Sequence, residues 1–277
     1  MNTLQPNVLT RDYIAPSMWY QDAPVAPSTP LFLAAYPGHP RVSVIIPALN
    51  EAENLRYVLP RVPEWVHEVV LVDGNSTDNT VEVARSIRPD IRIVQQQRQG
   101  KGAALRTGFN AATGDIIVML DADGSTDPAE IPAFVGALLA GADFVKGSRF
   151  LQGGGTSDMS LHRRWGNWFF VVVSRVLFGS HYSDLCYGYN AFYSRVLPKL
   201  ELDGDGFEIE TQMNLRVLRA GFKVAEVPSF EADRIHGKSN LRAFPDGWRV
   251  LKTMIKERFN TNLLTHSSAK HQVIDQI

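Results

Sequence analysis

The chain has 277 residues, of which 44% are hydrophobic, and its formal net charge at neutral pH is −1. It is long and apolar enough to bury a core as one large domain with extensions, and its charge excludes the global basic surface typical of nucleic-acid binding. Cys186 is the single cysteine, which excludes an intrachain disulfide framework and indicates a reducing compartment.

The first 40 residues form a proline-rich segment, with seven prolines between Pro6 and Pro40. Because proline blocks helices and sheet ladders, we expect a flexible or surface-draped extension. Residues 1–20 lack a basic stretch followed by an apolar one, so no signal peptide is predicted. The longest apolar run, 168–173, is far below the roughly 20 residues that span a bilayer. We therefore expect a soluble or peripheral protein, either cytoplasmic or on the cytoplasmic face of a membrane.

From Val42 onward, strands and helices are predicted to alternate. The predicted strands are apolar runs at 42–46, 68–72, 91–94, 115–120 and 142–146, and the helices between them lie at 51–59, 75–87, 102–112 and 128–140. Continuous apolar strands that alternate with helices indicate an α/β fold, a Rossmann-like doubly wound and mostly parallel sheet with helices on both faces.

After Gly147 the pattern is less regular. Helices are predicted around 161–178, 208–220 and 244–259, and a strand at 223–227. The helix at 244–259 is amphipathic and basic, so it is either an ordinary packed helix or one that lies on an anionic membrane. We expect one domain over residues 41–259 and a flexible tail over 260–277.

Two carboxylates, Asp121 and Asp123, directly follow the apolar strand that ends at Leu120. Open α/β sheets bind ligands at the carboxyl ends of their strands. Two carboxylates one residue apart there can both turn toward one hard cation, and Mg²⁺ is commonly held by one or two carboxylates together with substrate phosphates. The same pattern also occurs as a solvated acidic turn, so the neighbouring motifs decide between the two interpretations.

Other polar motifs follow the neighbouring strands. Asp73 ends the second strand, where a carboxylate suits a ribose hydroxyl or a base N–H. Asn50 and the cluster 75–78 are predicted helix caps. Gly100, Lys101 and Gly102 begin a helix, so they form either a tight turn or a place where backbone and lysine approach a phosphate or sugar. No G-x-G-x-x-G follows any strand, which argues against a dinucleotide-dependent oxidoreductase.

Taken in chain order, these motifs resemble family 2 glycosyltransferases of the GT-A fold. The matching segments are 44–51, 72–78, 100–102 and 120–123. Further segments are similar to the dolichyl-phosphate (polyprenyl-phosphate) mannosyltransferases, namely 147–150, Arg163 with Asn167, Asp184 with Gly188, and Arg234 with 237–239. The resemblance runs from residue 42 to about residue 258. Gly74 and the segment 124–127 depart from the usual family pattern, which leaves the base contacts and the donor sugar open.

The resemblance implies roles for individual residues. Donor binding would fall to Pro47, Leu49, Glu51, Asp73, Lys101, Asp121, Ala122, Asp123, Arg234 and Lys238. Within this set, Glu51 would contact the ribose, Asp73 the base, and Asp121 with Asp123 a Mg²⁺ or Mn²⁺ ion. Arg149 and Arg163 would face the phosphate of the acceptor, so the catalytic set is Asp121, Asp123, Arg149 and Arg163.

The implied reaction is metal-dependent, inverting sugar transfer from a nucleotide-diphosphate sugar, with GDP-mannose favoured, to a polyprenyl or dolichyl phosphate. Such an acceptor is already anionic, so it needs no general base. Two alternatives stay open. A soluble hydroxyl acceptor, with a UDP-sugar as a further donor option, would need a base such as Glu208, Glu210 or Asp184. A non-catalytic nucleotide-sugar-binding protein is the third reading.

Overall fold

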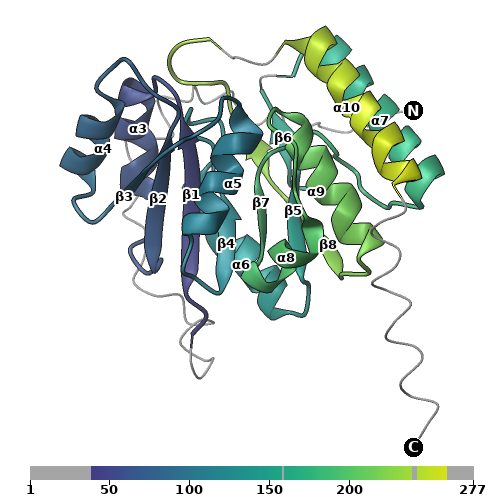
Figure 1. The fold of residues 1–277 in the computed structure, drawn as a ribbon, viewed down its shortest axis with the longest axis horizontal. Helices are drawn as coiled ribbons and strands as arrows, with labels where there is room; N and C mark the ends of the chain where they lie inside the picture. Colours follow the sequence, from purple (N-terminus) through teal and green to yellow (C-terminus); the bar gives the residue numbers. More distant parts are fainter. Residues whose placement is uncertain (1–38, 158, 239–241, 261–277) are drawn as a thin grey trace, which may run out of the picture.

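The computed structural model describes residues 39–157, 159–238 and 242–260. Its centre is a seven-stranded sheet in the order β3-β2-β1-β4-β7-β5-β8 (Figure 1). The strands are β1 (Val42–Ala48), β2 (Glu68–Asp73), β3 (Arg92–Gln95), β4 (Ile116–Met119), β5 (Phe144–Ser148), β7 (Asn190–Tyr193) and β8 (Val224–Pro228). All pairings in this sheet are parallel except those of β7, which runs antiparallel to β4 and β5. The predicted mostly parallel α/β sheet is therefore confirmed.

Helices cover both faces of the sheet. They are α3 (Ala52–Val58), α4 (Thr80–Ile87), α5 (Lys101–Ala111), α6 (Ile131–Leu139), α7 (Leu161–Phe178), α8 (Leu197–Leu200), α9 (Glu208–Arg219) and α10 (Ala243–Phe259). Single 3₁₀ turns lie at Leu59–Arg61, Pro128–Glu130 and Ser194–Val196, and a small parallel pair joins β6 (Gly155–Thr156) to β9 (Phe230–Glu231).

Alternation along the strands divides the core between the two faces. In β1, Val44 and Ile46 pack in one apolar cluster with residues of α3, α4 and α6, whereas Ile45 packs in another with residues of α5 and α9. A third cluster joins α7, α9 and α10. Helices α7 and α10 lie side by side (Figure 1), and buried residues of both pack in this cluster.

The sequence prediction missed β7. This strand has only four residues, and one of them is the buried polar Asn190, so it lacks the apolar run that marks the other strands. Its insertion between β4 and β5 separates two strands that follow each other in the chain. The expected extension 1–40 and tail 260–277 lie almost wholly outside the described residues.

Asp78 accepts from the N–H of Thr80, the first residue of α4, at 3.0 Å, as expected of a cap, but Asn50 has a different role. Asn50 adopts a left-handed conformation with φ 57°, and its side-chain oxygen accepts a hydrogen bond from the backbone N–H of Thr77 at 2.7 Å. The hydroxyl of Ser76 accepts from the N–H of Asn50, and Asp78 accepts from the N–H of Ala52. The prediction that Asn50 caps its helix is therefore wrong, because these polar groups tie the loop after β1 to the loop after β2.

Candidate active site

A cavity of about 1110 Å³ opens at the carboxyl ends of β1 and β4. The strand order reverses here, because β2 and β3 lie on one side of β1 and β4 lies on the other. Such a switch point is where open α/β sheets bind ligands. The cavity continues from there past the first turns of α5 and α9 to residues of α7 and α10.

Asp123 lies on the wall of this cavity and is held from two sides. Its Oδ1 accepts hydrogen bonds from the backbone N–H and the hydroxyl of Ser125, at 3.0 and 2.7 Å. Its Oδ2 accepts from Arg234 Nη1 at 3.1 Å. Arg234 also donates to Glu51, and its Nε donates to the carbonyl of His236 at 2.7 Å. One arginine from the loop after β9 therefore connects the loop after β1 with the loop after β4.

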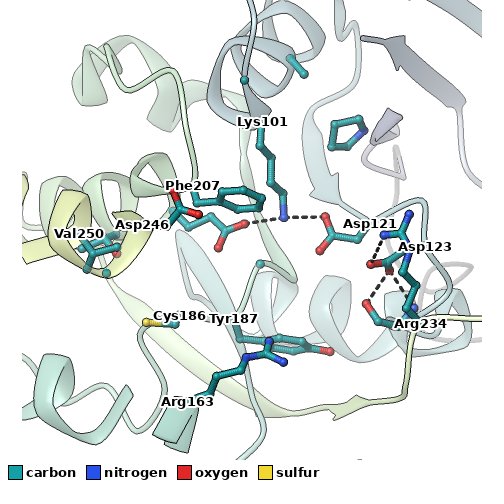
Figure 2. A pocket seen from close by; sticks show the side chains of 18 of the residues that line it. Lys101, Asp121, Asp123, Arg163, Cys186, Tyr187, Phe207, Arg234, Asp246 and Val250 are labelled. Carbon is teal, nitrogen blue, oxygen red and sulfur yellow. Dashed lines mark hydrogen bonds and ion pairs between the residues drawn. The ribbon is translucent and has the colours of Figure 1, made fainter. Parts of the chain in front are cut away.

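Asp121 faces a different cation. Lys101, the first residue of α5, places its Nζ 2.7 Å from Asp121 Oδ1 and 2.8 Å from Glu210 Oε1, and Figure 2 shows it between the two carboxylates. Gly188 lies behind this group, since a Cβ there would come within 2.6 Å of Glu210 Oε1 and 3.1 Å of Lys101 Nζ. Four segments far apart in the sequence thus meet at one point of the cavity wall.

The pKa values of these groups reflect the balance of burial and pairing. Burial raises the pKa of the Asp121 carboxyl, and repulsion from Asp123 and Glu210 adds to this against the attraction of Lys101. Burial alone would lower the pKa of Lys101, but the carboxylates of Asp121 and Glu210 outweigh it and raise that pKa. Burial also raises the pKa of Glu51 against hydrogen bonds from Asn54 and Arg234.

The donor set at this point fits a divalent cation that shares its shell with a ligand. Asp121 and Asp123 both line the cavity and offer hard carboxylate oxygens. Within the described part of the chain, no three or more Asp, Glu, His or Cys side chains form a metal-binding group. A Mg²⁺ or Mn²⁺ ion held here would therefore draw its remaining ligands from water and from substrate oxygens, as Mg²⁺ usually does.

Most of the predicted donor-binding residues come together. Pro47, Leu49, Glu51, Lys101, Asp121, Ala122, Asp123 and Arg234 all line the cavity. Two do not. Asp73 is buried at the end of β2, and its Oδ1 accepts from the N–H of Ser76 at 3.2 Å. Lys238 is exposed and lies outside the lining, beside residues that the structure does not describe.

Gln96, directly after β3, is a lining residue that the sequence prediction missed. Its Nε2 donates to the carbonyl oxygens of Arg98 and Gly100, which fixes the orientation of the amide. Its Oε1 lies 3.1 Å from the point where a Cβ on Gly74 would stand. The cavity wall beside Gly74 thus offers an amide oxygen of fixed orientation. The sequence prediction missed Gln96 because no local sequence signal distinguishes it from Gln95 and Gln97.

The glycines beside Lys101 serve chain packing. The carbonyl oxygen of Asp205 accepts from the N–H groups of Gly102 and Ala103, at 2.8 and 3.1 Å. A Cβ on Gly100 would come within 2.1 Å of that same oxygen. The glycines therefore allow close approach of the loop before α9, and an approach of this motif to a phosphate or sugar stays a prediction.

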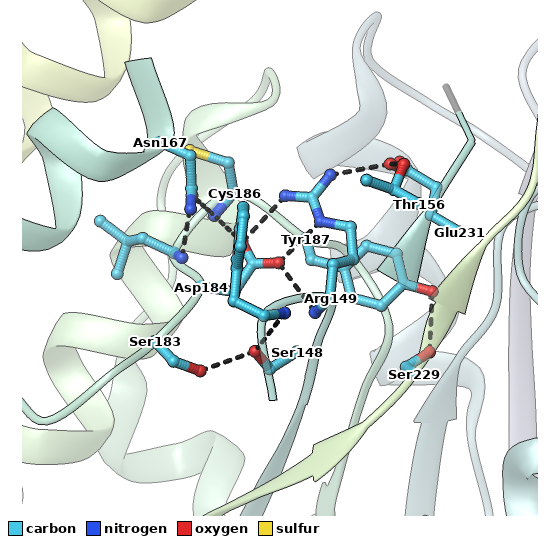
Figure 3. Close-up of polar contacts among 12 residues, drawn as sticks. Ser148, Arg149, Thr156, Asn167, Ser183, Asp184, Cys186, Tyr187, Ser229 and Glu231 are labelled. Atoms are coloured by element: carbon cyan, nitrogen blue, oxygen red, sulfur yellow. Dashed lines mark hydrogen bonds and ion pairs between the residues drawn. The ribbon is translucent and has the colours of Figure 1, made fainter. Parts of the chain in front are cut away.

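Arg149 lies in a closed polar network (Figure 3). Its Nε and Nη2 donate to the two oxygens of Asp184, at 2.6 and 2.8 Å, and its Nη1 donates to Glu231 at 2.9 Å. Its guanidinium carbon lies 4.9 Å from the centre of the Tyr187 ring. The side chain is only 3% exposed. Arg149 lines the cavity, but three of its five N–H groups are already engaged within the protein.

The part of the cavity beyond Arg149 is more apolar. Arg163 and His162, in the first turn of α7, lie on its wall, and Arg163 points toward Tyr187 in Figure 2. The remaining lining residues of this part include Met159, Phe169, Phe170, Phe207, Phe244, Trp248, Val250 and Leu251. The cavity therefore has an acidic and cationic end at the sheet and an aromatic end between α7 and α10.

Comparison with known proteins places this geometry in a family. Residues 43–199 match Glycosyl transferase family 2. A dolichol-phosphate mannosyltransferase of Pyrococcus furiosus is 31% identical over 73% of this chain, and the chain spans 59% of that longer protein. An undecaprenyl-phosphate mannosyltransferase of Micrococcus luteus is 30% identical, with 73% of this chain and 87% of the relative covered. A polyprenol monophosphomannose synthase of Mycolicibacterium smegmatis is 33% identical, with 78% and 85% covered.

The fold is also found in solved structures. Glucosyl-3-phosphoglycerate synthase from Mycobacterium tuberculosis, crystallised with Mn²⁺, UDP and phosphoglyceric acid, superposes with a TM-score of 0.64. The match covers 79% of each chain at 23% sequence identity. This similarity confirms the expected GT-A fold.

Proposed function

Because the chain belongs to glycosyl transferase family 2 and is a glycosyltransferase, we propose that it transfers a sugar from a nucleotide-diphosphate sugar to a polyprenyl phosphate. GDP-mannose is the favoured donor. The single observation that carries this proposal is the two-ended cavity, in which the Asp121–Asp123 pair lies at one end and the aromatic residues of α7 and α10 lie at the other. The three mannosyltransferase relatives named above support the same acceptor class.

In this proposal, the sheet end of the cavity binds the donor. Asp121 and Asp123 would hold Mg²⁺ or Mn²⁺, which supplies positive charge to the diphosphate as it leaves. Pro47, Leu49 and Glu51 line the cavity and would contact the nucleoside. Because Asp73 lies outside the lining, a contact with the base would need its buried carboxylate to turn, whereas Gln96 already faces that space.

The other end would bind the acceptor phosphate and its lipid chain. Arg163 supplies a planar, permanently charged guanidinium that matches phosphate oxygens. Arg149 would support this end from behind, since its bonds to Asp184 and Glu231 fix the wall of the cavity. An acceptor phosphate is ionised at neutral pH, so direct attack on the anomeric carbon needs no general base and inverts its configuration.

The helices at this end also suit contact with a membrane surface. Trp165 and Trp168 of α7 are 67% and 57% exposed, and Phe244 and Trp248 of α10 are 89% and 67% exposed. Arg249 and Lys252 lie nearby on α10. Aromatic side chains beside basic ones are typical of helices that lie in the bilayer interface. None of the helices that the structure describes is long and apolar enough to cross a bilayer.

Transfer of label into a lipid phase tests this proposal. The protein is incubated with radiolabelled GDP-mannose or UDP-glucose, Mn²⁺ and a polyprenyl phosphate, and the butanol-extractable label is counted. We expect labelled lipid that requires both Mn²⁺ and the lipid phosphate. Label that stays in the aqueous phase on a hydroxyl acceptor would instead support the soluble-acceptor alternative, and binding of the nucleotide sugar without turnover would support a non-catalytic role.

A further inference from the structure

The ammonium of Lys101 lies beside Asp121, where a bound metal ion would be expected. Its ammonium lies 2.7 Å from Asp121, the first residue of the acidic pair, and 2.8 Å from Glu210. Its side chain is only 17% exposed. Without a bound ligand, Asp121 therefore already has a positive partner that is supplied by the protein itself.

This ammonium is held in place by its surroundings. The backbone of Lys101 is fixed because the N–H groups of the next two residues donate to the carbonyl of Asp205. The ring of Phe207 lies 5.7 Å from Nζ, a distance at which a cation is attracted to an aromatic face. Gly188 leaves the space that the three charged side chains fill. Lys101 is thus positioned by α5, α9 and the loop before β7 together.

The charge of this ammonium has a direct consequence for a second cation. A divalent ion on Asp121 must either lie within a few ångströms of Lys101 or displace it, and both cost free energy in a partly buried site. A nucleoside diphosphate changes this balance, since its phosphate oxygens accept contacts from both the metal ion and the ammonium. Asp123 also has a cationic partner within the protein, because Arg234 donates to it.

We propose that Lys101 is an internal counter-cation that makes metal binding at Asp121 depend on the nucleotide. In the ligand-free protein, Lys101 pairs with Asp121 and Glu210 and weakens metal binding. When a nucleoside diphosphate enters, the ammonium turns from Asp121 to the phosphate, and Asp121 is released to the metal ion. The inference rests on the proposed function only in taking Asp121 and Asp123 as the metal-binding carboxylates.

The test measures Mn²⁺ binding by the loss of the free-ion electron paramagnetic resonance signal, with and without GDP. The signal that the same concentration of GDP removes in the absence of protein is subtracted. In the wild type, we expect GDP to tighten Mn²⁺ binding by about tenfold or more, in the range usual for coupled sites. In Lys101→Met, we expect nucleotide-free Mn²⁺ to bind about tenfold more tightly than in the wild type. The tightening by GDP should then become smaller, since the ammonium that responds to it is gone.

Two variants serve as controls. Lys199→Met removes an exposed lysine of α8 outside the cavity lining and should bind Mn²⁺ like the wild type. Lys101→Arg keeps the charge and should retain weak nucleotide-free binding, which separates loss of charge from loss of packing. Thermal melting of each variant shows whether it is folded. If Lys101→Met unfolds, Lys101→Gln, which is also neutral but keeps a polar side chain, takes its place with the same expected result.

The possible results test the metal site and the role of Lys101 separately. If folded Lys101→Met binds Mn²⁺ no more tightly than the wild type and GDP tightens it equally, the role of Lys101 is wrong while the metal site stands. If neither the wild type nor the variants bind Mn²⁺ even with GDP or UDP, the metal assignment of Asp121 and Asp123 fails, and the role of Lys101 fails with it. Tighter nucleotide-free binding in Lys101→Met, with a reduced effect of GDP, supports the proposal.

Discussion

Glu130 gives the clearest test of the electrostatics behind the cavity wall. It lies in the turn before α6, where the hydroxyl of Ser229 and the N–H of Phe230 both donate to its carboxyl group, the latter at 3.1 Å. Burial and, to a smaller extent, the charge of Asp127 raise the pKa of this carboxyl to about 7 against those hydrogen bonds. Ser229 in turn contacts the hydroxyl of Tyr187 at 2.8 Å, so the group lies directly behind the Arg149 network.

The direction in which the free energy of unfolding changes with pH depends on whether the folded or the unfolded chain binds the Glu130 proton more tightly. Below pH 4.5 the carboxyl is neutral in both the folded and the unfolded chain. Between pH 4.5 and about 7 the unfolded chain releases the proton while the folded chain keeps it, so the free energy of unfolding falls as the pH rises. A pKa difference of this size corresponds to about 3 kcal/mol, and partial solvent access reduces the expected effect to about 2 kcal/mol.

We therefore predict that Glu130→Gln, which stays neutral, has nearly wild-type stability at pH 5 and is about 2 kcal/mol more stable than the wild type at pH 8. Urea unfolding followed by tryptophan fluorescence at pH 5, 6, 7 and 8 measures the difference. Glu82→Gln, at an exposed position of α4, is the matched control. Parallel pH profiles for wild type and Glu130→Gln, or a variant that loses stability as the pH rises, would refute the reasoning.

Four further substitutions test the site and the core. Asp123→Asn should keep the melting temperature of the wild type but lower metal-dependent turnover by about 10² or more, because it removes one strong electrostatic contact; wild-type turnover with metal still required would contradict its role. Arg163→Lys should reduce transfer to polyprenyl phosphate while leaving donor affinity and slow donor hydrolysis nearly unchanged, because lysine lacks the planar fork; a parallel fall in both activities would assign Arg163 to the donor or the fold. Gly108→Ala in α5 places a Cβ 2.3 Å from Ile45 Cγ2, so overpacking of about 1–3 kcal/mol should exceed the helix-propensity gain of about 1 kcal/mol. A Cβ on Gly136 in α6 would have no atom within 4 Å, so Gly136→Ala should stabilise the protein by about 0.5–1 kcal/mol. Urea unfolding midpoints that shift in the same direction for Gly108→Ala and Gly136→Ala would contradict this packing.

The sequence by itself determined the fold class and the position of the acidic pair. Apolar strands that alternate with helices are a local pattern, and a carboxylate directly after such a strand lies at the carboxyl edge of a parallel sheet whatever the order of its strands. Asp121, Asp123 and Glu51 could therefore be placed at one edge without knowledge of the tertiary structure. The helix at 161–178 was predicted with the bounds of α7 because its apolar residues recur at helical spacing.

Only the tertiary structure decided which partner each of these side chains has. Arg149 contacts Asp184 and Glu231, which lie 35 and 82 residues away in the chain, and this contact depends on the insertion of β7 beside β5 and on the place of β9. Lys101 meets Glu210 because the loop before α9 packs against Gly100 and Gly102. A pair of charges so far apart in sequence leaves no periodic signal along the chain, since its free energy arises from burial and distance, and both exist only once the chain has folded.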